Sequence, residues 1–239
     1  MRHIATLTVL ALTVGSAAEA ADLRSINLLT QGEFRLLAQD LAAASAFKGL
    51  APATPLGPTG MDVAASMGFT QLDSPKIWRK ASFGQGIFTE TVRPSLRLTK
   101  GLPFGLDVGF TYAGLANAGG NIAGAELRWA VVSGSGSLPA VGLRVATTRL
   151  AGIDQVRLSN TSYELVASKA FGSVTPYLSL GRVDTRATPR NAGALQVESF
   201  SQRRVAVGSR FNVGAVDLTL EGDLTGNTTS GSGRVGLRF

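Results

Sequence analysis

The chain has 239 residues, of which 44% are hydrophobic and only 16% are charged, and it contains 29 glycines and no cysteine. The low charge excludes a disordered chain, and the lack of cysteine excludes disulfide frameworks, zinc fingers and thiol catalysis. The length suits one compact β domain of the barrel size class or two small domains.

The first twenty residues have the pattern of a secretory signal peptide. Arg2 supplies a positive charge, residues 4–14 are apolar, and Ala18-Glu19-Ala20 fits a small-x-small cleavage site. We therefore expect residues 1–20 to be a cleaved signal peptide. Cleavage would remove one charge of each sign, leaving the net charge at +7, and would also remove His3, the only histidine.

Residues 21–59 differ in character from the rest of the chain. Phe34, Leu37 and Leu41 recur at helical spacing within residues 32–47, and a proline-rich stretch follows at 51–58. The segment is therefore predicted to hold a short amphipathic helix and an extended linker.

From Gly60 onward, apolar and polar residues alternate in segments of about ten residues separated by Gly, Ser, Asn and Pro. This period of two is typical of half-exposed β-strands. The pattern predicts about ten strands, with eight or twelve also compatible, and so an all-β, antiparallel transmembrane barrel over residues 60–239. The predicted strands are 60–71, 91–100, 103–114, 121–133, 139–149, 159–171, 173–184, 196–212, 214–224 and 230–239.

The predicted connections alternate between short and long. Short ones lie around Gly101, at 133–138, at Gly172 and at 212–214, and longer ones at 72–90, 115–120, 150–158, 185–195 and 225–229. Transmembrane barrels have short periplasmic turns and longer outer loops, whereas a β-sandwich has no reason to sort its connections in this way. The longer connections are therefore expected on the outer side.

Along the predicted strands, charged residues of both signs alternate with apolar residues and so lie on the opposite face. Small residues are interleaved with the charged ones and leave room for their side chains inside a narrow barrel. Either a polar pore lining or a charge-balanced network that fills the lumen fits this pattern, and the excess of arginine would favour anions in any residual pore. The predicted lumen charges are Arg93, Arg97, Arg128, Arg144, Arg204, Arg210, Arg234, Arg238, Asp62, Asp107, Glu126, Glu164, Asp217 and Glu221.

Aromatic residues gather at both ends of the apolar faces. Tyr112 and Phe104 share one strand and lie about 20 Å apart at ~3.3 Å per residue and a tilt near 40°. Two such girdles flanking an apolar band are typical of a barrel in a bilayer. The predicted girdles are Phe104, Phe171, Phe211 and Phe239 beside the short turns, and Phe69, Tyr112 and Tyr163 beside the long loops.

The chain ends in Phe239 after the alternating Val235 and Leu237. Here the sequence resembles the outer-membrane β-barrel proteins of Gram-negative bacteria as a broad class, whose last strand commonly closes with a phenylalanine that the barrel-assembly machinery reads. The resemblance covers residues 60–239, identifies no specific family and transfers no active site. It implies an outer-membrane location, contact with outer-membrane lipid, and recognition of the last strand by that machinery.

For the predicted helix, two roles remain open. As a plug, the helix would enter the lumen or cap its periplasmic mouth through Phe34, Leu37 and Leu41. Alternatively, it rests on the periplasmic rim or at the membrane interface. Both roles place the N-terminal segment in the periplasm.

The sequence offers no constellation for catalysis. Loss of His3 with the signal peptide removes histidine-dependent triads and histidine-ligated zinc, and the glycines at 134–136 lack a phosphate-binding motif. We expect no catalytic residues, cofactor or metal, and nucleic acid is an implausible partner for an exported barrel. A Ser/Lys or carboxylate-only enzyme is kept as a remote option.

Basic residues concentrate in or beside the predicted outer loops. Lys76, Arg79 and Lys80 lie in the first of these, and Arg149, Arg157, Arg186 and Arg190 lie in or beside later ones. The first three are candidates for contact with lipopolysaccharide phosphates, where charge-assisted hydrogen bonds are strong. Solvated loop charge is the alternative explanation.

The function that the sequence favours is a non-enzymatic, porin-like barrel that acts as a narrow or plugged channel for small solutes. The alternative is a structural or surface-interaction barrel that contacts lipopolysaccharide or a partner through its outer loops.

Overall fold

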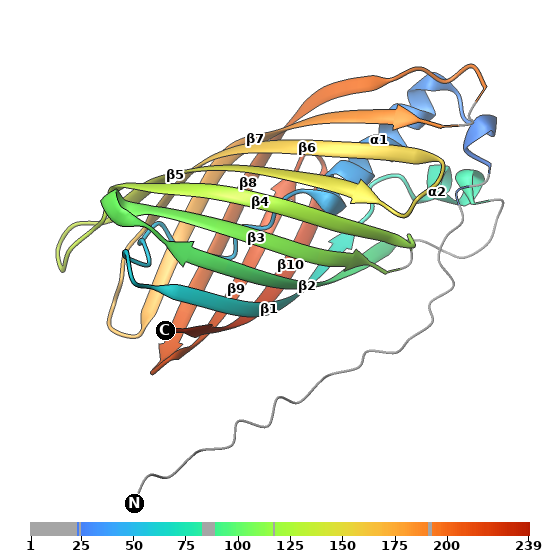
Figure 1. The fold of residues 1–239 in the computed structure, drawn as a ribbon. Helices are drawn as coiled ribbons and strands as arrows, with labels where there is room; N and C mark the ends of the chain where they lie inside the picture. Colours follow the sequence, from blue (N-terminus) through green and yellow to red (C-terminus); the bar gives the residue numbers. More distant parts are fainter. Residues whose placement is uncertain (1–22, 24, 83–88, 117, 191–192) are drawn as a thin grey trace, which may run out of the picture.

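The computed structural model describes residues 23, 25–82, 89–116, 118–190 and 193–239. Ten antiparallel strands close into a barrel in which each strand pairs with its sequence neighbours and β1 pairs with β10 (Figure 1). The predicted barrel is confirmed, and the alternatives of eight and twelve strands are excluded. The strands are β1 (Met61–Gln71), β2 (Glu90–Gly101), β3 (Leu106–Leu115), β4 (Gly120–Val132), β5 (Ala140–Ala151), β6 (Val156–Ser168), β7 (Val174–Pro189), β8 (Glu198–Val213), β9 (Val216–Thr225) and β10 (Thr228–Arg238).

Three features of the connections differ from the prediction. The expected long loops at 115–120 and 150–158 are reduced to residues 116–119 and 152–155, because the flanking strands extend further, and both are shorter than the connection at 133–139. The expected long loop at 225–229 is a two-residue turn, because Thr225 and Thr228 still pair across the ladder and Gly226 adopts the positive φ of +60° that a tight turn needs. The first long connection contains a helix that the sequence analysis missed, α2 (Pro75–Ala81). Residues 72–89 and 190–197 remain long connections, and both lie at the same end of the barrel, which we call the long-loop end.

The strands are strongly tilted relative to the barrel axis. The tilt follows from the register of paired residues around the barrel. Starting from Leu96 on β2, the row of paired residues reaches β7 at Arg186 when followed through β3 to β6. It reaches β7 at Val174 when followed the other way, through β1, β10, β9 and β8. This offset in register is what closing a sheet into a barrel requires.

The barrel has an apolar exterior and a charged interior. Along β5, exposed Leu143 and Val145 alternate with buried Arg144, and the other strands repeat this arrangement. A water-soluble barrel has the opposite arrangement, so this is the architecture of a barrel that crosses a membrane. No helix among the described residues is long and apolar enough to span a bilayer.

The structure places the predicted girdle aromatics on the outer surface. All seven are exposed on the outer side, with Phe104 and Phe239 beside the short turns and Tyr112 and Tyr163 nearer the long-loop end. Their placement delimits an apolar band between two levels of aromatic rings, as a bilayer favours.

A helix enters the barrel from the long-loop end (Figure 1). This helix, α1 (Gln31–Ser45), follows a short 3₁₀ turn (Ile26–Leu28) and begins with a capping box, in which the Thr30 and Glu33 side chains and backbone amides bond reciprocally. Its apolar face packs in a cluster, here called the cap cluster, that seals this end of the barrel. The main members of the cap cluster are Leu23, Ile26, Phe34, Leu37, Leu41, Trp78, Leu115, Ile122, Leu150 and Leu158.

The position of α1 corrects one expectation. As a plug, the helix was expected to enter the lumen or to cap the periplasmic mouth, which was assigned to the short-turn end. The helix does lie within the barrel, with Phe34, Leu37 and Leu41 buried, but it occupies the opposite mouth among the long loops. The reason is that β1 begins at the short-turn end, where Met61 pairs with Phe239, so residues 46–60 traverse the whole lumen before the first strand starts. An extended segment of this length spans at most about 50 Å, which suffices for the crossing.

Asp40 joins α1 to the first long connection. Its carboxylate accepts hydrogen bonds from the indole of Trp78 at 2.9 Å and from the backbone amides of Ser74 at 3.0 Å and Asp73 at 3.2 Å. Burial raises the pKa of Asp40, and these donors partly offset that effect. A carboxylate inside the mouth thus holds α2 against the plug helix.

Replacing Asp40 with alanine should loosen the cap, because the Trp78 indole and two amides would lose their acceptor, at a cost of about 3 kcal/mol. In a Trp129→Phe background, acrylamide quenching of Trp78 reports the loosening directly. Asp73→Ala is the matched control, since that side chain is exposed. Equal protection of Trp78 in both variants would show that Asp40 does not hold the cap.

Candidate functional site: a segment threaded through the lumen

The most distinctive feature of the interior is the chain that follows α1. Residues 46–56, here called the luminal segment, run through the barrel without regular secondary structure and are largely buried. Their backbone groups lack the internal hydrogen bonds of a helix, so each needs a partner from the barrel wall. The inward-facing charges of the strands supply these partners.

Two arginines of β2 bind the first part of the luminal segment. Arg93 donates to the carbonyl of Ala46, and Arg97 donates to the carbonyls of Lys48 and Gly49. The Arg97 guanidinium also lies 4.6 Å from the centre of the Phe47 ring, a cation–π distance. Positive side chains thus satisfy main-chain acceptors of the luminal segment and contact its aromatic ring.

Lys48 provides the charged side chain by which the luminal segment contacts the wall. Its ammonium lies 2.9 Å from both carboxylate oxygens of Asp223 and donates to Ser230 at 2.9 Å. Both Lys48 and Asp223 are almost fully buried. A buried pair of this kind is costly to break, because the remaining charge would have no partner.

Further along, the wall contacts the segment from several strands. Glu221 of β9 accepts from the amide of Leu50 at 3.1 Å, and Arg144 of β5 donates to the carbonyl of Ala51 at 3.1 Å. Near the short-turn end, Ser168 accepts from Ala53 and Asp107 accepts from Leu56, each at 3.1 Å. Contacts on all sides hold the segment near the middle of the lumen.

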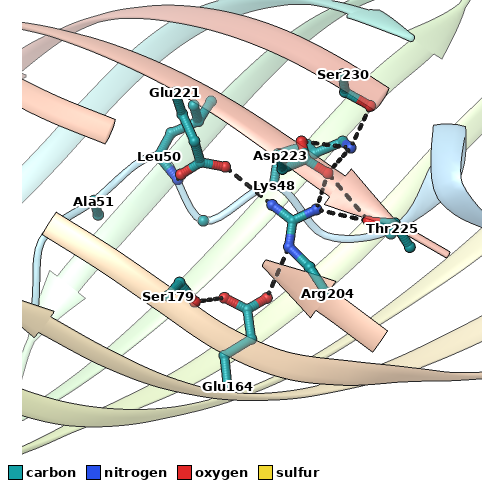
Figure 2. A network of polar contacts seen from close by, with 12 residues as sticks. Lys48, Leu50, Ala51, Glu164, Ser179, Arg204, Glu221, Asp223, Thr225 and Ser230 are labelled. Atoms are coloured by element: carbon teal, nitrogen blue, oxygen red, sulfur yellow. Dashed lines mark hydrogen bonds and ion pairs between the residues drawn. The ribbon is translucent and has the colours of Figure 1, made fainter. Parts of the chain in front are cut away.

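Arg204 is the centre of the network that surrounds the segment (Figure 2). Its guanidinium lies 2.6 Å from Asp223, 2.9 Å from Glu221 and 3.4 Å from Glu164. Because Asp223 also binds Lys48 and Glu221 also binds the Leu50 amide, one arginine connects three strands to the plug (Figure 2).

A second group of charges lies nearer the short turns. Arg234 bridges Asp62 and Asp217, and Arg238 lies 3.2 Å from Asp62 and 3.3 Å from Asp217. Arg210 approaches Asp217 at 3.5 Å. This group connects β1, β8, β9 and β10 across the seam where the barrel closes.

The structure places every predicted lumen charge on the inner face of the wall. All of them are buried except Arg238, which is partly exposed. Four residues of the interior were not predicted from the sequence: Lys48, Asp223, Asp40 and Tyr177, whose buried hydroxyl donates to Glu221 at 2.7 Å. Asp223 continues the inward series of β9 after Asp217 and Glu221, so alternation was a usable signal for it. Lys48 and Tyr177 gave no such signal, because the linker has no period and Tyr177 reads as an ordinary strand aromatic.

The basic residues of the first long connection lie on or beside α2. Lys76 and Arg79 are exposed, whereas Lys80 binds the Glu33 carboxylate at 2.7 Å. The Lys80 ammonium and the Thr30 amide lower the pKa of Glu33. Lys80 therefore contributes to attaching α1, which reduces its availability to an outside ligand.

The described part of the chain holds no group of three or more acidic or histidine side chains arranged to bind a metal ion. The N-terminal segment extends through the barrel, from α1 in the cap cluster at one mouth to Leu56, which binds Asp107 near the other.

No protein-family model and no curated protein matches the chain. Among solved structures, it is similar to the N-terminal β-barrel domain of Pseudomonas aeruginosa OprF, with 11% identity, a TM-score of 0.39, and coverage of 77% of this chain and 99% of that one. The KdgM porin in complex with disordered oligogalacturonate gives 9% identity, a TM-score of 0.40, and coverages of 76% and 99%.

Ail, the attachment invasion locus protein of Yersinia pestis, in complex with the heparin analogue sucrose octasulfate, gives 13% identity, a TM-score of 0.30, and coverages of 75% and 97%. At these identities the likenesses concern the barrel fold alone. By architecture the chain is a transmembrane β-barrel: closed, antiparallel, apolar outside and charged within.

Replacing Arg204 with glutamine should destabilise the barrel by about 3–5 kcal/mol, because Glu164, Glu221 and Asp223 would lose a shared buried partner. Urea unfolding in detergent micelles measures the change. Arg203→Gln is a matched control one residue away, since Arg203 points outward and is exposed, and it should stay within about 0.5 kcal/mol. Equal effects of the two changes would contradict the assigned role of Arg204.

Proposed function

We propose that this protein is a self-plugged surface barrel: its own N-terminal segment closes the lumen, and its functional surface is the long-loop end. The observation that carries the proposal is that charged side chains of the wall bind the luminal segment directly along its length. These contacts run from Arg93, on the side of the long-loop end, to Asp107 near the short turns. A barrel used as an open pore has no need for this set of contacts.

The long-loop end supports the second half of the proposal. There α1, α2 and the described flanking residues Leu72 and Leu195 pack in the cap cluster, and Asp40 binds Trp78. Arg35 of α1 also binds Glu198 at the start of β8 at 3.1 Å. A packed assembly at this mouth is a surface for contact with lipid or with a partner.

A gated channel for small solutes is the second candidate, and one observation favours it. Most wall contacts to the luminal segment are made to its main chain. If the segment left, the exposed interior would retain its arginines and would be polar, so anions would be the preferred solutes.

Conductance in planar bilayers distinguishes the two functions. The full-length protein should show no steady conductance, and a variant lacking residues 22–55 should conduct, because its lumen would hold only wall side chains. Steady conductance by the full-length protein would contradict the plug. Brief openings of the full-length protein that the deletion makes permanent would support the gated channel.

A labelling measurement that keeps the full chain tests the plug independently of the deletion variant. The protein has no cysteine, so Ser45→Cys, a nearly isosteric change at a fully buried plug residue, can be compared with Leu28→Cys at a residue that is 54% exposed. A maleimide should label position 28 at least about tenfold faster, as expected for a seated plug. Similar rates would show that the plug is not seated.

The orientation of the plug gives a separate prediction in intact cells. If the long-loop end faces outward, as loop length indicates, a membrane-impermeant maleimide should label Leu28→Cys from outside. Gly136→Cys, exposed in the turn at the other end, is the control and should be labelled only after the outer membrane is permeabilised. The reverse pattern would place the N-terminal segment in the periplasm.

A further inference from the structure

Three arginines cluster on the outer surface of the barrel near the long-loop end. Arg149 of β5 and Arg186 of β7 both pair with Ser159 of β6, so all three side chains lie in one row on the same face. Arg157 of β6 lies two positions further along on that face, opposite Thr188. The three guanidiniums are exposed and point away from the lumen.

These residues surround a hollow of about 600 Å³, to which Ser159 and Thr188 also contribute. The hydroxyl groups of Ser159 and Thr188 are hydrogen-bond donors that can complement the guanidiniums. The hollow therefore presents cationic forks and neutral donors to the outside, which is the donor set that a phosphate group accepts.

The level of the cluster relative to the membrane follows from the strand that carries it. Tyr163, one of the outward aromatics, lies on the same face of β6 as Ser159, and Leu165 lies beyond it in the apolar band. At ~3.3 Å per residue and a tilt near 40°, Ser159 is about 10 Å further from the bilayer centre than Tyr163. Aromatic belts lie at the headgroup level, so the arginines are level with headgroup phosphates.

The charge balance of this sector is strongly positive. Arg182 and Arg203 face outward beside the cluster, and the carboxylate of Asp184 is occupied by Arg182 at 3.1 Å. Within the described chain, no carboxylate is within ion-pairing distance of the three clustered arginines, the exposed Asp154 of the adjoining turn included. In contrast, the corresponding outward positions of β9 and β10 carry Leu224 and Thr229.

We propose that Arg149, Arg157 and Arg186 form a binding site for the phosphorylated headgroup of an outer-leaflet glycolipid, lipid A of lipopolysaccharide. The guanidiniums bind the phosphate oxygens, Ser159 and Thr188 add neutral donors, and the acyl chains lie against Leu165 and its apolar neighbours. Arginine suits this role because its planar fork matches phosphate geometry and it is weakly hydrated.

The site lies on β-strands rather than on Lys76, Arg79 and Lys80 of the first long connection, which the sequence suggested as lipopolysaccharide contacts. Rigid strands fix the spacing of the three guanidiniums, whereas Lys80 is already paired with Glu33. The site also lies on the outside of the barrel wall, so it does not depend on the proposed closed lumen, but it rests on the proposed outward orientation of the long-loop end.

The test uses the full-length refolded protein in detergent micelles and native mass spectrometry of retained lipid. The probes are bisphosphorylated lipid A, its dephosphorylated form, and inorganic phosphate as a competitor. Arg149→Gln with Arg186→Gln should weaken binding of bisphosphorylated lipid A by at least about tenfold. Lys76→Gln with Arg79→Gln removes the same charge at the same end of the barrel and should change binding less than about threefold.

Both variants alter exposed side chains, so folding is checked by the heat-dependent shift of the barrel on gels. Strong preference for the phosphorylated lipid, lost only in the Arg149 and Arg186 variant, is the expected result. Equal loss in both variants would show that net charge alone attracts the lipid and would overturn the proposal. So would undiminished binding by the arginine variant, or displacement of the lipid by millimolar inorganic phosphate.

Discussion

Arginine side chains that point into a closed barrel must find acceptors, and the rest of this structure depends on that constraint. Guanidinium groups carry five donors and stay charged, and isolation of such a charge from water is costly. The inward carboxylates bind some of these donors, as Asp217 does for Arg234. The main-chain carbonyls of the luminal segment accept from Arg93, Arg97 and Arg144.

The same constraint explains why the plug is an extended segment in the middle and a helix only at one end. A helix would bond its carbonyls internally and offer none to the wall. Where the wall is apolar, at Leu115, Ile122 and Leu158, the chain forms α1 and packs its side chains instead. Secondary structure of the N-terminal segment thus follows the chemistry of the wall that faces it.

The outer face has a different distribution of side chains, because lipid rather than protein surrounds it. Exposed leucines and valines fill the middle, aromatic rings mark the levels at which the apolar band ends, and arginines follow beyond Tyr163 on β5 to β8. The arginines inside the barrel bind carboxylates and carbonyls of the chain itself, whereas Arg149, Arg157 and Arg186 have no carboxylate partner among the described residues. This difference separates the structural arginines from those assigned to lipid.

By itself, the sequence determined the antiparallel barrel and the inward face of the predicted charges, because alternation with period two is a local property of each strand. The sequence allowed eight, ten or twelve strands, and the closed tertiary structure decided for ten. It also predicted α1 from the spacing of Phe34, Leu37 and Leu41. Only the tertiary structure decided which mouth α1 occupies, that Lys48 binds Asp223 and that Asp40 holds Trp78. Those contacts join residues far apart in the chain, and an aperiodic linker carries no signal of the direction in which it crosses a lumen.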